Sequence, residues 1–284
     1  MSQESETSAA TVVEVPRLLL SVSPHIRTRT DIQVVMYSVV VALVPSMIGA
    51  VYFFGLRALW LMLTSTLTAV LAEALCQKLR GRVITINDGS AVITGILLAY
   101  NVPPGVPYWL VALGSAFGII VGKHIFGGLG YNIWNPALLG RAFLMASWPV
   151  HMTTKWLAPR LGTLSGIDAV TTATPLNVLK EAHRAFADPT SLPQQISLAK
   201  LSVSQLYSAQ GLTNLFWGNV GGCIGEASTA LLLIGATFLL VRRIIDWRIP
   251  FTYIVTAAVL GWIFGGAKGF FTGNALFQVL SGGL

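Results

Sequence analysis

Charged residues are scarce in this sequence. Asp, Glu, Lys and Arg make up 10% of its 284 residues, whereas hydrophobic residues make up 54%. A soluble globular domain carries about 25% charged residues, which cover its surface. The composition therefore predicts a membrane protein, and it excludes a disordered chain and a coiled coil.

Cysteine is also scarce, and basic charge is not gathered in one place. The two cysteines, Cys76 and Cys223, lie in apolar stretches, which excludes a disulfide framework and a cysteine-rich zinc or iron–sulfur site. We predict no metal site and expect both to be small buried hydrophobes. The 18 Lys and Arg residues are scattered between apolar runs, which excludes a nucleic-acid interface.

The N-terminus lacks the features of a secretory signal. Glu4, Glu6 and Glu14 precede any apolar run, where a signal peptide would carry Lys or Arg. Residues 1–17 are therefore predicted to be a disordered cytoplasmic tail.

Long apolar runs dominate the rest of the chain. A helix needs about 20 mainly apolar residues to cross a bilayer. The runs predict an all-α polytopic membrane protein with about seven full transmembrane helices and a truncated eighth. They cover 34–54, 58–76, 89–102, 108–121, 136–150, 212–241 and 249–267, with a last run from Ala275 to Leu284. We expect a first bundle of five spans over 18–150 and a second, incomplete bundle over 212–284, as in a fragment or a chain that has lost its terminal spans.

Basic residues in short loops set the orientation, because they favour the cytoplasmic side. All clusters of Lys and Arg fall on the cytoplasmic side only if 212–241 crosses the membrane once, as a broken or re-entrant segment. The polar stretch 151–211 is then an extracytoplasmic loop, although its own Lys and Arg residues run against the rule. The basic residues placed on the cytoplasmic side are Arg17, Arg27, Arg29, Lys78, Arg80, Arg82, Lys123, Arg242, Arg243 and Arg248.

Two polar, glycine-containing segments adjoin short spans. Asn87-Asp88-Gly89 and 221–226 have the pattern of broken helices in two halves related as inverted repeats, although small residues also serve plain helix packing. Asp88 and Glu226 could bond backbone amides freed at the breaks, or they could belong to an ion pathway. Four other ionisable residues are expected to reach the membrane interface, namely Glu73, Lys123, His124 and Arg141.

The loop contains the segment 168–176, Asp-Ala-Val-Thr-Thr-Ala-Thr-Pro-Leu. The proline after Thr174 favours an extended backbone with an accessible hydroxyl, which an assisting enzyme could esterify to a phosphate. From the residues alone, the segment also fits a threonine-rich turn capped by Asp168.

This segment resembles the flavinylation motif of the membrane subunits shared by Rnf complexes and sodium-pumping NADH:quinone reductases. From about Leu18 onward the chain is similar to the D subunit of Rnf complexes. The likeness is carried by Ser23-Pro24-His25, 88–95, Asn132 with Asn135-Pro136-Ala137, and 225–228.

The resemblance implies that Thr174 bears FMN through a phosphoester. Asp168, Thr171, Thr172 and Ala173 would form the sequence that a flavin transferase recognises, with Thr172 in place of the usual glycine. It also implies a second, non-covalent riboflavin, to which no residues are assigned. The protein would itself carry no catalytic residue.

The implied function is that of a membrane subunit in an ion-translocating ferredoxin:NAD+ oxidoreductase. Electrons would pass through the FMN while Na+ or H+ crosses a prokaryotic cytoplasmic (inner) membrane. The partners would be Rnf subunits A, B, C, E and G, the flavin transferase and the lipid bilayer. The alternatives are a small-solute channel or transporter with a urea-transporter-like fold and a passive assembly subunit. Asn135-Pro136-Ala137 is an aquaporin-like motif, but aquaporins need two such motifs and this chain has one.

Overall fold

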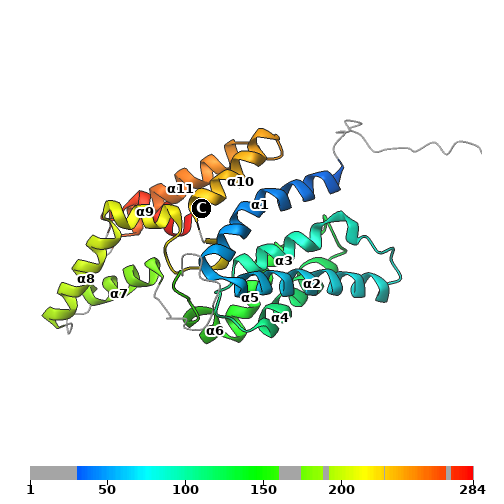
Figure 1. Ribbon diagram of the computed structural model, residues 1–284, viewed down its shortest axis with the longest axis horizontal. Helices are drawn as coiled ribbons and strands as arrows, with labels where there is room; N and C mark the ends of the chain where they lie inside the picture. Colours follow the sequence, from blue (N-terminus) through cyan, green and yellow to red (C-terminus); the bar gives the residue numbers. More distant parts are fainter. Residues whose placement is uncertain (1–30, 160–173, 188–191, 227, 267–269, 284) are drawn as a thin grey trace, which may run out of the picture. The chain divides into compact units, whose positions relative to one another are not determined.

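The computed structural model describes residues 31–159, 174–187, 192–226, 228–266 and 270–283. These residues form helices and loops, so the predicted all-α class is confirmed for this part of the chain (Figure 1). All of them except Asp31 belong to the compact unit Ile32–Leu284. The predicted tail 1–17 lies outside the described residues.

The helices follow the apolar runs and then enter the polar stretch. The first six are α1 (Ile32–Phe54), α2 (Leu56–Leu79), α3 (Ser90–Tyr100), α4 (Tyr108–Ile119), α5 (Pro136–Ser147) and α6 (Pro149–Thr154). The next six are α7 (Pro175–Ala187), α8 (Pro193–Leu206), α9 (Ala209–Trp217), α10 (Thr229–Val241), α11 (Arg248–Phe264) and α12 (Ala275–Gln278). Short 3-10 segments cover Ile86–Asp88 and Ile224–Glu226, and π-helical segments cover Ile120–His124 and Val279–Gly283.

Among the described residues, two helices are long and apolar enough to cross a membrane, judged by length and composition. They are α1, with 23 residues, and α2, with 24. The apolar helices α3, α10 and α11 are shorter, with 11, 13 and 17 residues. The run 212–241 divides into the end of α9, the 3-10 turn Ile224–Glu226 and α10, which confirms the predicted break. The run 136–150 ends early, at Ser147, because Pro149 restricts the backbone of Trp148 and starts α6.

Small residues bring the first helices close together. The main core lies among α1 to α5, and α1 also packs against α10 (Figure 1). Ser65 on α2 donates a hydrogen bond of 2.7 Å to the carbonyl of Gly95 on α3. A methyl group on Gly95 would lie 2.5 Å from the Cα of Thr66, so only glycine permits this approach. This is the packing that small residues provide in membrane helices.

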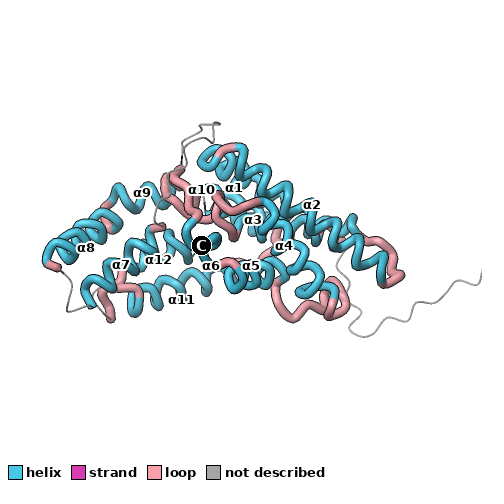
Figure 2. The backbone as a smooth tube through the Cα atoms, turned by 90° about the horizontal axis from the view of Figure 1, so that it is seen from below, coloured by secondary structure: helices cyan, strands magenta, loops and turns pink. Residues whose placement is uncertain are grey.

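The polar stretch 151–211 contains helices that the sequence analysis did not predict. Helices α7 and α8 pack against each other, and α8 leads through a short turn into α9 (Figure 2). Helix α7 places Leu179 and Ala182 inward, while Glu181 and Arg184 lie at a groove between α7 and α8. The described parts of this stretch are therefore largely helical and not a plain connection.

Candidate functional site

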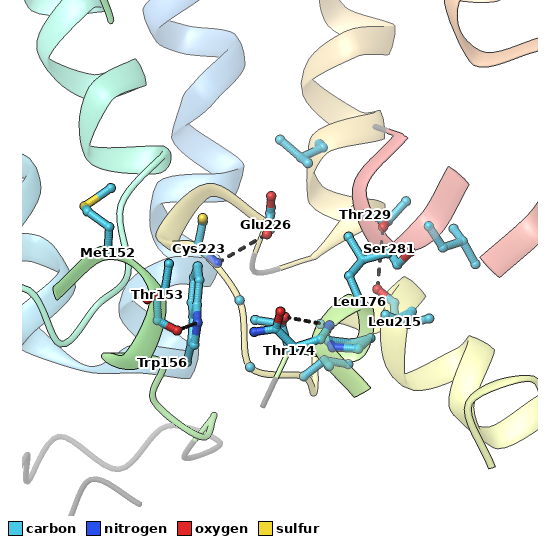
Figure 3. Close-up of a pocket in the computed structure, with 18 of the residues that line it drawn as sticks. Met152, Thr153, Trp156, Thr174, Leu176, Leu215, Cys223, Glu226, Thr229 and Ser281 are labelled. Atoms are coloured by element: carbon cyan, nitrogen blue, oxygen red, sulfur yellow. Dashed lines mark hydrogen bonds between the residues drawn. The ribbon is translucent and has the colours of Figure 1, made fainter. Parts of the chain in front are cut away.

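Thr174 lies immediately before α7 and caps it. Its Oγ1 accepts a hydrogen bond of 3.3 Å from the backbone N–H of Asn177, and its carbonyl accepts one of 3.0 Å from Val178 (Figure 3). Pro175 occupies the first helical position, where its missing N–H costs nothing. The hydroxyl of Thr174 is thus held at the positive end of a helix dipole. The neighbouring motif residues Asp168, Thr171, Thr172 and Ala173 lie outside the described residues.

Thr174 opens onto a cavity of about 320 Å³. This volume is at the lower end of the range for small-molecule sites, about 300–1,000 Å³. The walls come from α5, α6, the start of α7, the glycine-rich turn before α10, and the last residues of the chain. They include Arg141, Trp156, Gly221, Gly222, Cys223 and Glu226. Sequence reasoning found Thr174 and Glu226 but did not place them on one cavity.

The cavity contains charged side chains of both signs. Arg141, on α5, is half-buried and donates from Nη1 to Oδ1 of Asn101 at 3.0 Å. Glu226 accepts a hydrogen bond of 3.3 Å from the backbone N–H of Cys223 at its Oε2 (Figure 3). The carboxylate of Glu226 therefore bonds a backbone amide in the break between α9 and α10.

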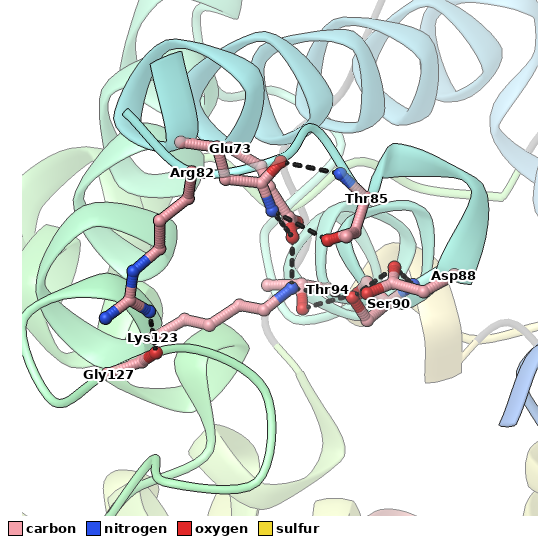
Figure 4. Close-up of polar contacts among 9 residues, drawn as sticks. Glu73, Arg82, Thr85, Asp88, Ser90, Thr94, Lys123 and Gly127 are labelled. Carbon is pink, nitrogen blue, oxygen red and sulfur yellow. Dashed lines mark hydrogen bonds and ion pairs between the residues drawn. The ribbon is translucent and has the colours of Figure 1, made fainter. Parts of the chain in front are cut away.

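Asp88 has the same kind of role at the other predicted break. Its Oδ1 accepts from the backbone N–H of Ser90 at 2.9 Å and from the hydroxyl of Ser90 at 2.6 Å (Figure 4). These bonds cap the start of α3, where backbone donors lack helical partners. Both acidic residues thus bond amides at helix breaks, as one of the two interpretations expected.

A buried ion pair joins α2 to the π-helical segment after α4. Lys123 Nζ lies 2.6 Å from Oε1 of Glu73 and donates to the Ser90 hydroxyl at 2.6 Å (Figure 4). The side chains of Glu73 and Lys123 are 1% and 3% exposed, and His124 is also buried. The expectation that these three side chains reach the interface is wrong. The reason is that helix packing turns Lys123 inward, where Glu73 compensates its charge.

The polar network continues from this pair toward the loop before α3. Gln77 donates from Nε2 to Oε1 of Glu73 at 3.2 Å and to the hydroxyl of Thr85 at 2.9 Å. Oε2 of Glu73 is buried without a hydrogen-bond partner in the described part of the chain. One signal in the sequence could have located this cluster, a glutamate inside an otherwise apolar helix.

A second cavity, of about 330 Å³, is lined in part by Lys123. The rest of its polar lining consists of Ser90, Thr94, Asn132 and Asn135. The side chain of Asn135 accepts from the backbone N–H of Ala137 at 3.0 Å and so caps α5. Asn135-Pro136-Ala137 is therefore a helix start at the edge of this cavity.

Comparisons with known proteins cover nearly the whole chain. Residues 19–284 match the model of the NQR2, RnfD, RnfE family. The chain is 43% identical over 265 residues to the D subunit of the proton-translocating ferredoxin:NAD(+) oxidoreductase complex of Clostridium ljungdahlii, covering 93% of this chain and 75% of the relative. It is 42% identical over 248 residues to the D subunit of the Na(+)-translocating ferredoxin:NAD(+) oxidoreductase complex of Acetobacterium woodii, covering 87% and 70%. It is 35% identical over 270 residues to the D subunit of the ion-translocating oxidoreductase complex of Stutzerimonas stutzeri, covering 90% and 73%.

Proposed function

This chain belongs to the NQR2, RnfD, RnfE family, and from that premise we propose that it is the D subunit of an ion-translocating ferredoxin:NAD+ oxidoreductase complex. Two relatives above 40% identity carry that activity in their names. The subunit relays electrons through an FMN bonded to Thr174 and is not catalytic alone. Its partners are the other membrane and peripheral subunits of the complex, and a flavin transferase attaches the FMN.

The position of Thr174 is the observation that carries this proposal. A phosphate on its Oγ1 would lie at the N-terminus of the 13-residue helix α7, where backbone N–H groups and the helix dipole favour an anion. The hydroxyl also faces a cavity, so an attached group has space to enter the protein. A threonine within a packed turn would offer neither feature.

The cavity lining suits a flavin. Trp156, Met145 and Met152 supply aromatic and polarisable surface for a flat ring, while Gly221 and Gly222 leave the backbone accessible. When bound, the flavin supplies the electron chemistry, and the protein sets its position and local charge. A tethered flavin stays at one place in the relay even if its ring is weakly held.

A non-covalent riboflavin is the second cofactor that we propose. The cavity beside Lys123 offers the hydroxyl of Thr94 and the amides of Asn132 and Asn135, while Ser90 and Lys123 are already bonded to Asp88 and Glu73. Such groups can bond the hydroxyl chain and the ring carbonyls of riboflavin. We therefore assign this cavity to the second flavin.

We further propose the membrane arrangement and the ion route. The chain crosses a prokaryotic cytoplasmic membrane about seven times, its N-terminus is cytoplasmic, and 151–211 lies outside, where the transferase acts. The short apolar helices α3 and α10 fit broken spans, whose polar ends can line an ion route. Asp88 and Glu226 are the candidates for that route, and the coupling ion is Na+ or H+.

The covalent flavin is tested on a denaturing gel. The full chain, co-expressed with a flavin transferase, should give a band that fluoresces under ultraviolet light, and its intact mass should exceed the polypeptide mass by one FMN unit. Thr174→Ala should abolish both signals because the acceptor oxygen is gone. Thr153→Ala is the matched control, since it removes another hydroxyl from the same cavity and should keep the band.

Two outcomes would contradict the proposal. A wild-type chain of unmodified mass, made with a competent transferase, would exclude the flavin relay. If that chain also admitted small solutes into liposomes, the channel or transporter alternative would take its place.

A further inference from the structure

Arg141 is a cation without an anionic partner in the described part of the chain. Its hydrogen bond of 3.0 Å goes to Oδ1 of Asn101, a neutral amide. The one ion pair within 4.0 Å among the described residues is Glu73–Lys123, on other elements. A guanidinium has five N–H donors and stays charged at any physiological pH. Most of the donors of Arg141 are therefore free for another group.

The guanidinium is held at the cavity by its neighbour. Asn101 donates from Nδ2 to the carbonyl of Leu97 at 2.8 Å, which fixes its amide and directs Oδ1 toward Arg141. Arg141 itself lines the cavity that Thr174 opens onto. An amide oxygen orients a guanidinium but does not neutralise it, and an ionised side chain at membrane depth is costly unless it is compensated. Glu226 lines the same cavity but is not within 4.0 Å of Arg141, so a further anion beside the guanidinium would compensate it.

We infer that Arg141 stabilises the negative charge that the isoalloxazine ring gains when the flavin on Thr174 is reduced. The inference rests on the proposed function. The oxidised ring is neutral, and uptake of two electrons from the ferredoxin-class donor with one proton leaves it with one negative charge. The phosphoester has its own donors at the start of α7, whereas Arg141 comes from α5, so the two anionic parts of the cofactor are served by different elements.

The consequence is a raised reduction potential. A nearby positive charge stabilises the reduced, anionic ring relative to the oxidised, neutral ring. Glu226 lines the same cavity with the opposite charge, so its carboxylate should lower the potential. Arg141 and Glu226 should therefore change the reduction potential of the same flavin in opposite directions.

The test is a spectroelectrochemical titration of the full chain, co-expressed with the transferase and purified with its covalent flavin. Arg141→Gln should shift the midpoint potential to more negative values. Arg141→Lys should shift it less, because the charge stays and only the planar fork of donors is lost. Glu226→Gln should shift it to more positive values. In-gel fluorescence measures the loaded fraction, which should stay at the wild-type level in all three variants.

The outcomes separate this inference from its premise. An Arg141→Gln protein that carries flavin and has the wild-type potential overturns the inference and leaves the covalent site intact. If Arg141→Gln does not fold, Arg141→Met, which also removes the charge, is titrated in its place, and the wild-type potential in that variant overturns the inference. A wild-type chain without flavin overturns the proposed function and this inference together.

Discussion

At the scale of single residues, the pairing of Glu73 with Lys123 is the most consequential contact. The two residues lie 50 positions apart, yet their charged atoms are 2.6 Å apart and almost fully buried. Removing one partner of a buried pair leaves the other charge uncompensated, which costs more than the pair contributes over apolar residues of similar size. The pair also holds Ser90 at the start of α3 through the Lys123 ammonium.

We expect Glu73→Gln and Lys123→Met each to lower the free energy of unfolding by about 3–5 kcal/mol, because each leaves one buried charge without its partner. The double variant should lose less than the sum of the two. Urea unfolding of the purified chain in detergent measures all three. Lys78→Met, an exposed position on the same helix, is the control and should change stability by less than about 0.5 kcal/mol. Additive losses in the double variant would contradict the coupling.

At the scale of elements, the short helices depend on what satisfies their ends. Helix α3 has 11 residues and α10 has 13. Both are shorter than the roughly 20 residues that cross a bilayer, so their first backbone amides need partners outside the helix. Asp88 accepts from the amide of Ser90, the first residue of α3, and Glu226 accepts from the amide of Cys223 before α10. A break within the membrane is tolerated only when such partners satisfy the freed backbone groups.

Substitutions of Asp88 separate its capping role from a role in ion passage. Asp88→Ala removes the oxygen that accepts from the Ser90 amide and should cost about 1 kcal/mol of stability, the usual value for a lost cap. Asp88→Asn keeps an acceptor oxygen and should stay near the wild type in the same unfolding measurement. If Asp88 belongs to the ion route, both variants lower ion uptake into vesicles that contain the assembled complex. Full uptake by Asp88→Asn would leave Asp88 with the capping role alone.

At the scale of the whole molecule, the proposed orientation places the two cavities on opposite sides of the membrane. The Thr174 cavity adjoins the stretch 151–211, which we propose to lie outside. The cavity beside Lys123 adjoins residues assigned to the cytoplasmic side by the positive-inside rule. A relay with one flavin near each surface would carry electrons across the membrane.

Site-directed labelling tests this orientation. In a chain with Cys76 and Cys223 replaced by alanine, Ser197→Cys on α8 should react with a membrane-impermeant maleimide in intact cells, because its side chain is exposed and the proposed orientation places α8 outside. Lys78→Cys, also exposed, should react only after the membrane is permeabilised. The reverse pattern would invert the topology and place Thr174 on the cytoplasmic side, away from the proposed site of flavin transfer.

The sequence by itself determined the features that depend on composition and on neighbours along the chain. Apolar runs predicted the helices outside the stretch 151–211, Asp88 and the glycines near 221–226 predicted the breaks, and the segment ending at Thr174 carried the family resemblance. Only the tertiary structure decided that Lys123 turns inward to Glu73, and that Arg141 and Glu226 line the cavity at Thr174. Hydropathy and spacing report the immediate neighbours of a residue. The contacts that set charge and cavity shape here join side chains tens of residues apart, and helix packing alone determines which of them meet.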